Sequence, residues 1–337
     1  MQQDEIIIRE GIVHILDGEL GYPVYSEEKL ELSPVINDFF RAHIYKLFSG
    51  DDLKKCYFDE EAASPVYEIV KGFSEENLVE SSKKLAEKLY EIMNANIAIP
   101  SGDLAVVSFQ VNGKKHLAIL KLNYKESFVH MTNTEETGNV NQIICYQSTL
   151  PTTGVKLSEA VIIDLSDFSV QLVEKKYEVN GKKVNYLSEL FLNCKAAMSQ
   201  KTRLNIVTKA VEQVNRKHFE DEPLKAMEAK SVIKEEIENT GALNVEHVSE
   251  KLYGDMPQIK EEFDAKMEKY HMEKAEVKPQ SEKTTKKFEK QYLKTDTGIE
   301  INIPMEQFED IEQVEFITNA DGTISVLIKN INKISTR

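Results

Sequence analysis

The amino-acid sequence predicts an α+β fold, with N-terminal helices and a central antiparallel sheet, a helical middle segment and a small C-terminal β element. Three observations support it. Apolar residues recur at helical spacing both before residue 100 and after residue 185. Between these segments, short apolar runs are joined by Asn112-Gly113 and Asn180-Gly181, dipeptides that favour tight turns between antiparallel strands. Strand-like runs return near the C-terminus, and strands grouped apart from helices indicate α+β rather than α/β architecture.

The first hundred residues predict one strand and two helices. A strand is expected over residues 6–16, where Asp17-Gly18 ends the apolar run. Ser33-Pro34 predicts the start of a helix, because serine caps a helix N-terminus and proline suits the first helical position, and Ser49-Gly50 predicts its end. A second amphipathic helix is expected to begin at Ser74 and to continue to about residue 93.

The segment from residue 104 to residue 185 predicts an antiparallel sheet. The strands are expected at 104–111, 116–124, 127–132, 142–150, 160–165, 169–179 and 183–185. The two Asn-Gly dipeptides place hairpin turns between the first two and between the last two of these strands. We therefore expect one sheet built from neighbouring strands.

Helices are expected again after residue 185, followed by a polar segment and a β-rich tail. The helices are expected at 186–194, 199–219, 224–238, 245–253 and 257–272, and the tail strands at 287–294, 299–303, 314–318 and 323–328. Residues 273–285 are polar, contain a proline and lack an apolar face, which is typical of a linker. The predicted organisation is an α+β domain over 1–185, a helical domain over 186–272, a linker over 273–285 and a C-terminal β-hairpin element over 286–337.

Composition limits the location and chemistry of the protein. The chain has 337 residues and a formal net charge of -15, with 41% hydrophobic residues. No stretch approaches the roughly 18 to 20 apolar residues that a membrane helix needs, and the N-terminus lacks the features of a secretory signal. Cys56, Cys145 and Cys194 have no metal or redox spacing. We therefore expect a cytoplasmic protein with free thiols and no membrane contact.

Residues 175–217 differ in charge from the rest of the chain. They hold ten basic and three acidic side chains, a net charge of +7 within a chain of -15. A polyanion would be attracted there and repelled by most other surfaces. The candidate nucleic-acid-binding residues are Lys182, Lys183, Lys195, Lys201, Arg203, Lys209, Arg216 and Lys217.

The helix expected at 199–219 separates its apolar and basic residues. At about 100° per residue, the two sets fall on opposite sides. The apolar side holds Leu204, Val207, Val211 and Val214, and the other side holds Lys201, Lys209 and Arg216. Lys182 and Lys183 follow a hairpin turn and could face the same phosphate backbone. Because helix exteriors and hairpin tips are often charged for solvation alone, both interpretations stay open.

The sequence contains no recognised catalytic motif. There is no dinucleotide-binding glycine pattern, phosphate-binding loop, zinc-protease motif or nucleophile elbow, and the seven histidines lack paired metal spacing. Asp164 and Asp167 could form a carboxylate pair, although aspartates at a strand end more often shape a turn. The expectation is a non-enzymatic protein without cofactor or metal.

Several stretches together resemble the NdpA-like nucleoid-associated protein family of bacteria. They are IVHILDGELG, SPVINDFFRAHI, SGDLAVVSFQVNGKKHLAILKLNY, EAVIIDLSDFSVQLVEKKYEVNG, YLSELFLNCKAAMSQKT and the closing run LKTDTGIEINIPMEQFEDIEQVEFITNADGTISVLIKNI. The resemblance covers nearly the whole chain and is weakest over 255–285. It implies a cytoplasmic protein found with the compacted chromosome, and it supplies no catalytic or metal-binding residues.

Two functions follow from the charge pattern and the resemblance. The first is a non-enzymatic nucleoid protein that associates with chromosomal DNA, directly or indirectly, through phosphate contacts that do not read sequence. The second is an adaptor that a DNA-processing protein recruits to the nucleoid, with Asp51-Asp52 and Asp59-Glu60-Glu61 docking a basic surface. The sheet and tail strands could also pair between chains, so a homodimer is a further expectation.

Overall fold

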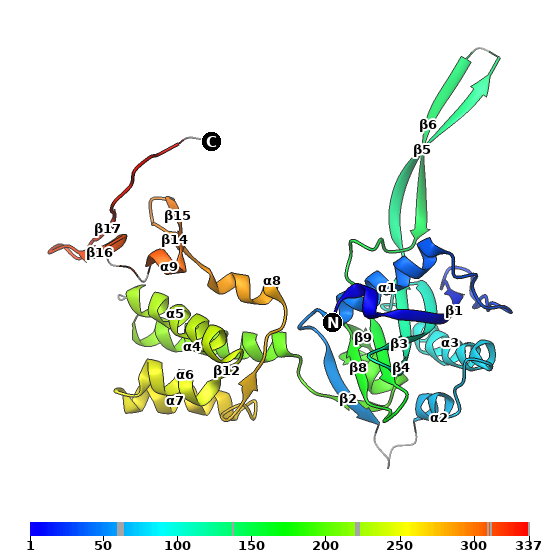
Figure 1. The fold of residues 1–337 in the computed structure, drawn as a ribbon, viewed down its shortest axis with the longest axis horizontal. Helices are drawn as coiled ribbons and strands as arrows, with labels where there is room; N and C mark the ends of the chain where they lie inside the picture. The colour runs from blue at the N-terminus through cyan, green and yellow to red at the C-terminus, as the bar shows by residue number, and fades with distance from the viewer. Residues whose placement is uncertain (59–63, 137, 220–222, 309, 311, 336–337) are drawn as a thin grey trace. The chain divides into compact units, whose positions relative to one another are not determined.

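The computed structural model describes residues 1–58, 64–136, 138–219, 223–308, 310 and 312–335 (Figure 1). It divides the chain into two compact units, 1–199 and 200–337. From the sequence we expected the first domain to end at residue 185, and the rest of the chain to form a helical domain, a linker and a C-terminal hairpin element. The acidic run Asp59-Glu60-Glu61 lies outside the described residues.

Unit 1 is organised around a seven-stranded sheet whose neighbouring strands all run antiparallel. In spatial order the strands are β1 (Ile7–Leu16), β3 (Gly102–Val111), β4 (Lys114–Asn123), β7 (Ala160–Asp164), β8 (Val170–Val173), β2 (Lys54–Phe58) and β11 (Cys194–Ala196). Together with the helices, this sheet confirms the predicted α+β class.

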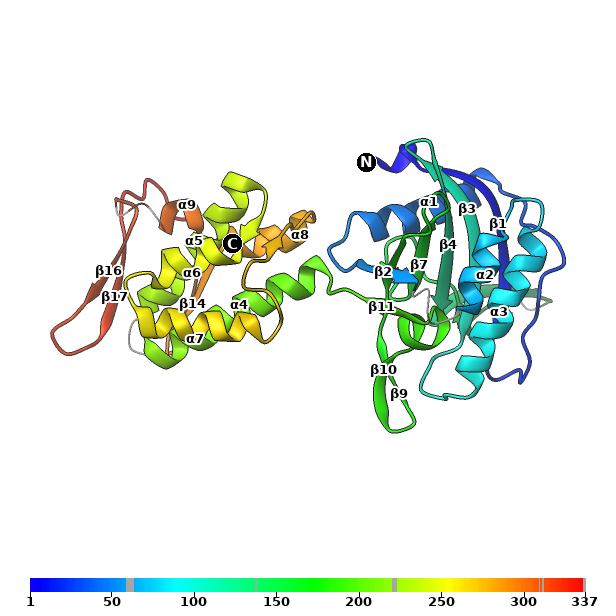
Figure 2. The same ribbon diagram turned by 90° about the horizontal axis from the view of Figure 1, so that it is seen from below.

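Both faces of the sheet are buried. Helices α2 (Pro65–Lys71) and α3 (Leu78–Asn94) share one core with Leu104 and Val106, whereas α1 (Pro34–Phe48) shares the other with alternate residues of the same strand. Because successive side chains of a strand point to opposite faces, two buried faces require continuous apolar runs. Figure 2 shows the strands with helices packed against them.

Local capping signals fix the ends of the helices. The Ser33 hydroxyl accepts a hydrogen bond from the Ile36 amide, and α1 begins at the following proline, as predicted. Helix α3 begins later than expected, at Leu78. The Ser74 amide donates to Asn77 Oδ1 at 2.9 Å, so this segment forms a turn that precedes the helix. Neither α2 nor β2 was predicted from the sequence.

Both predicted Asn-Gly hairpins form. All four turn residues have positive φ, as the tight hairpin turn requires. However, the single sheet expected over 104–185 is wrong. The strands β5 (Lys125–Glu135) and β6 (Gly138–Thr149) pair only with each other, and so do β9 (Lys176–Val179) and β10 (Lys182–Asn185). Most side chains of β5 and β6 are exposed, so this pair is not held against the core.

Residues 186–199 belong to unit 1. Tyr186 and Phe191 are fully buried in its core, and the short π-helical turn η2 (Leu187–Phe191) leads into β11. The expectation of free thiols is wrong for two of the three cysteines, because Cys56 of β2 and Cys194 of β11 form a disulfide. Their separation of 138 residues hid this pairing from spacing rules.

Unit 2 is built on four helices. They are α4 (Gln200–His218), α5 (Pro223–Thr240), α6 (Val245–Tyr253) and α7 (Pro257–Glu268). Their apolar faces form one core that includes Val207, Ile233, Val248 and Phe263. The Asn244 side chain caps α6 by accepting from the His247 amide.

The segment expected to be a linker packs into this core. Val277 is fully buried, and β13 (Glu276–Val277) pairs with β12 (Leu243–Asn244). After it the chain forms small elements in the order α8 (Glu282–Thr285), η3 (Lys286–Phe288), β14 (Lys290–Lys294), β15 (Glu300–Pro304), α9 (Met305–Phe308), β16 (Val314–Thr318) and β17 (Ile324–Ile328). The tail hairpins β14–β15 and β16–β17 match the expected strands to within a few residues.

The buried side chain of His14 should make the folded protein less stable in acid. The Ser26 amide donates to His14 Nδ1, so Nε2 carries the proton and donates to Ser82 Oγ at 2.9 Å. Burial, and secondly the charge of Lys83, lowers the pKa of His14 to about 4. An unfolded chain therefore binds a proton that the folded chain rejects, and stability falls as the pH drops from about 6.5 to about 4.

Between neutral and acid pH, we expect His14→Gln to lose less unfolding free energy than the wild type, by up to about 3 kcal/mol. Chemical denaturation of the wild type and the variant at pH 7 and pH 4.5 measures it. Glutamine does not titrate. If the wild type and the variant lose the same unfolding free energy between the two pH values, His14 is not the source of the acid sensitivity.

Candidate nucleic-acid interface

Helix α4 separates a buried face from an exposed face. Its buried side includes the four apolar residues predicted from helical phase, and Lys201, Lys209 and Arg216 are exposed. The buried side packs in the same core as Phe263 and Met267 of α7. The packing of α4 against α7 therefore leaves the exposed edges of both helices next to each other.

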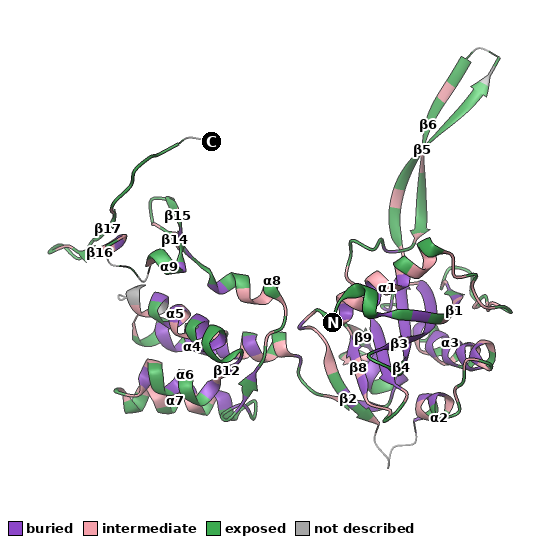
Figure 3. Cartoon of the chain, viewed as in Figure 1, coloured by how far each residue is buried: buried purple, intermediate pink, exposed green. Residues whose placement is uncertain are grey.

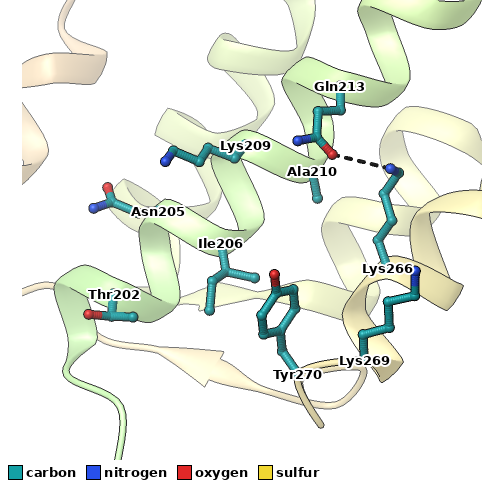
Figure 4. A pocket seen from close by; sticks show the side chains of 9 residues that line it. All are labelled: Thr202, Asn205, Ile206, Lys209, Ala210, Gln213, Lys266, Lys269 and Tyr270. Carbon is teal, nitrogen blue, oxygen red and sulfur yellow. Dashed lines mark hydrogen bonds between the residues drawn. The ribbon is translucent and has the colours of Figure 1, made fainter. Parts of the chain in front are cut away.

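A hollow of about 440 Å³ lies between these two edges (Figure 4). Its lining residues are Thr202, Asn205, Ile206, Lys209, Ala210, Gln213, Lys266, Lys269 and Tyr270. Three of them are lysines, and no carboxylate from the described part of the chain is among them. The amide, hydroxyl and ammonium groups can all donate hydrogen bonds to an anion.

The lysines reach the hollow from different elements. Lys209 comes from α4, whereas Lys266 and Lys269 come from α7 and the residues that end it (Figure 4). Lys266 Nζ donates to Gln213 Oε1 at 3.2 Å, a contact that joins the two sides. Figure 4 also shows the Tyr270 ring beside Ile206, at the apolar floor between the cations.

Lys287 adjoins this hollow, and Lys201 is close enough to Lys287 to affect its pKa. Lys287 Nζ donates to Asn205 Oδ1 at 3.4 Å. Burial lowers the pKa of Lys287, the charge of Glu212 opposes that shift, and the charge of Lys201 adds to it. We call Lys201, Lys209, Lys266, Lys269 and Lys287 the lysine face. Lys287 is partly desolvated and is repelled by Lys201, and a bound polyanion would offset both costs.

The residues predicted from the sequence divide between the two units. Lys182, Lys183 and Lys195 are exposed on β10 and β11 of unit 1, whereas Lys201, Arg203, Lys209, Arg216 and Lys217 lie on α4 of unit 2. The structure gathers only Lys201 and Lys209 of the eight into the lysine face. Arg203 is half-buried.

Lys217 is engaged in an ion pair. Its Nζ lies 2.7 Å from Glu262 Oε2, and His218 Nε2 lies 2.8 Å from the same oxygen. The hydrogen bonds from His218 and Lys217 lower the pKa of Glu262 to about 2. The acidic partner therefore remains charged at neutral pH and reduces the attraction of this end of α4 for phosphate.

Sequence reasoning missed Lys266 and Lys269. Their spacing of three residues on an amphipathic helix does place them near one another. Their position opposite Lys209 depends on the packing of α7 against α4, which no local pattern contains. In the sequence, Lys287 is one of five lysines over residues 282–294, where two glutamates dilute their charge.

Other candidate sites have structural explanations. Asp164 Oδ1 accepts from the Ser166 amide at 2.9 Å, and Asp167 Oδ1 accepts from the Ser169 amide at 2.8 Å, so both aspartates shape the turn after β7. Among the described residues, no group of three His, Cys, Asp or Glu side chains could hold a metal. No helix in that same part of the chain is long and apolar enough to cross a membrane.

Asp51 and Asp52, which were expected to dock a basic partner, offer less negative charge at the surface than the sequence suggested. Asp51 is buried, and Asp52 Oδ2 lies 2.8 Å from Lys156 Nζ. A basic partner would have to compete with that lysine.

Comparisons with known proteins identify one family. A family model described as "Nucleoid-associated protein YejK" matches residues 12–334. A comparison with individual curated proteins gave no match.

Proposed function

Because the chain belongs to the nucleoid-associated protein YejK family, we propose that it contacts chromosomal DNA directly, through the lysine face of unit 2. The membership confirms the resemblance predicted from the sequence and makes the protein nucleoid-associated. The observation that carries direct contact is the carboxylate-free hollow lined by Lys209, Lys266 and Lys269, in a chain whose net charge is -15.

The chemistry of the lysine face suits phosphate rather than base edges. Lysine ammonium groups act as mobile point charges, whereas reading a guanine edge is typically the task of bidentate arginine. The neighbouring Asn205 and Gln213 amides and the Thr202 hydroxyl can add phosphate contacts that fix position without carrying sequence information. We therefore propose binding that is independent of sequence.

A salt series tests this proposal. If five lysines each neutralise one phosphate, the logarithm of the binding constant should fall with the logarithm of salt concentration with a slope of about -4.5. Fluorescence anisotropy of the full chain with a duplex of mixed sequence, and with a second unrelated duplex, gives this slope and the sequence dependence. Absence of binding at low salt would refute direct contact and leave recruitment by a DNA-processing protein as the route to the nucleoid.

A further inference from the structure

An aromatic ring lies in the hollow between α4 and α7, among the cations of the lysine face. Tyr270 follows the end of α7 and lines the hollow together with Ile206 of α4. Figure 4 shows the ring with Ile206 on one side and the side chains of Lys266 and Lys269 on the other. A ligand that enters the hollow would therefore meet this ring.

The Tyr270 side chain is not part of the packed core of unit 2. The residue is 49% exposed. Within the described residues its ring contacts no other ring, and its hydroxyl has no hydrogen-bond partner. By contrast, Tyr253 of the same unit is buried (Figure 3), and its hydroxyl donates to Asn215 Oδ1 at 2.7 Å. The half-exposed ring of Tyr270 thus offers a face on which a planar ligand could stack.

Two lysines beside this ring have ammonium groups that the fold does not use. Lys266 Nζ donates to Gln213, as described above. The ammonium groups of Lys209 and Lys269 form no ion pair or hydrogen bond with another residue of the described ranges. Their charges can therefore contact a phosphate without first releasing a partner within the chain.

The hollow and its lining fit a nucleotide whose base is unpaired. Its volume of about 440 Å³ lies in the range of roughly 300 to 1,000 Å³ that is typical of pockets enclosing a ligand. A duplex keeps its bases stacked inside the helix, so its phosphates need only cations at a surface. A single strand exposes both phosphates and base faces, and proteins bind it with a cationic groove that also carries aromatic rings. The lysine face with Tyr270 supplies both parts.

We propose that this hollow binds an unpaired nucleotide of single-stranded DNA, with the base stacked on Tyr270 and the flanking phosphates on the lysine face. The proposal rests on the proposed function, because it assigns a preferred form of DNA to the same surface. Every base has a face that can stack on a tyrosine ring, so the contact does not depend on sequence. On the chromosome, the occupant is a segment whose two strands have separated.

A fluorescent reporter tests whether a base enters the hollow. The chain contains no tryptophan, so Tyr270→Trp places a single indole there and keeps an aromatic ring. Oligothymidylate, which has no paired bases, should quench the indole emission to saturation, and a duplex of mixed sequence should quench it far less. Tyr22→Trp is the matched control, at a tyrosine of unit 1 that is 63% exposed, and its emission should not change.

Affinity measurements separate stacking from charge. Tyr270→Ala should weaken binding of oligothymidylate about 5- to 100-fold, the usual loss when one stacking ring is removed. Its affinity for duplex should change by less than about twofold, and the salt slope of single-strand binding should stay the same, because no phosphate contact is lost. Tyr270→Phe keeps the ring and should bind the oligonucleotide like the wild type. Circular dichroism verifies the fold of each variant.

The outcomes distinguish this proposal from the proposed function. If Tyr270→Ala binds single strands as tightly as the wild type while duplex binding persists, the stacking site is wrong and the lysine face remains a duplex site. Tighter binding of oligouridylate would make RNA the occupant, and displacement of the strand by equally low concentrations of thymidine monophosphate would make it a free nucleotide. Either result overturns single-stranded DNA. Absence of binding to both forms of DNA would refute direct contact itself.

Discussion

Lys209→Glu/Lys266→Glu/Lys269→Glu should bind duplex DNA at least about 100-fold more weakly than the wild type at ~100 mM salt. The change replaces three cations around one hollow with three anions, so phosphate loses three contacts and meets repulsion instead. The slope of binding against salt should shrink by roughly 2.7, because three fewer counterions are released. Anisotropy titrations across the salt series used for the wild type measure both quantities.

A control variant tests whether the position of the removed lysines matters, and not only the change in net charge. Lys182→Glu/Lys183→Glu/Lys195→Glu changes the net charge by the same amount on exposed residues of unit 1. We expect its binding to weaken only slightly, through long-range repulsion that salt screens. If the unit 1 variant loses as much affinity as the unit 2 variant, the lysine face has no special role. Circular dichroism verifies that both remain folded.

Features set by neighbouring residues could be predicted from the sequence. The cap at Ser33, the Asn-Gly turns and the apolar side of α4 each depend on residues within a few positions, and each is present in the structure. The start of α3 shifted because a local hydrogen bond to Asn77 competed with the first turn of the helix. This is why the α+β class could be predicted while the arrangement of its strands could not.

Features set by distant residues were hidden. The lysine face requires α7 to pack against α4, and the disulfide joins cysteines 138 residues apart. The polar segment around Val277 resembled a linker because its few apolar residues have no period, yet two of them reach the core of unit 2. Charge counting located two of the five lysines of this face, both on α4, since net charge follows from sequence alone. Tertiary packing selected the other three.

A buried ion pair in unit 1 gives the largest expected effect on stability. Glu159 and Lys121 are almost completely buried, and Glu159 Oε2 lies 3.8 Å from Lys121 Nζ. Tyr186 Oη donates to Glu159 Oε1 at 2.6 Å, and Tyr177 Oη donates to Oε2 at 3.1 Å. Burial lowers the pKa of Lys121 to about 8, and the charge of Glu159 opposes that shift. Removing the carboxylate would therefore leave a desolvated ammonium without its counter-charge.

We expect Glu159→Ala to destabilise unit 1 by about 3 to 5 kcal/mol, the usual result of removing one partner from a buried pair. Urea denaturation followed by circular dichroism measures the loss. The informative control is Lys121→Met/Glu159→Gln, which removes both charges and keeps an acceptor for the Tyr186 hydroxyl. Its stability should return most of the way to the wild type. If this double variant is as unstable as Glu159→Ala, the loss of stability does not come from the unpaired charge of Lys121, because a charge effect must disappear once both charges are gone.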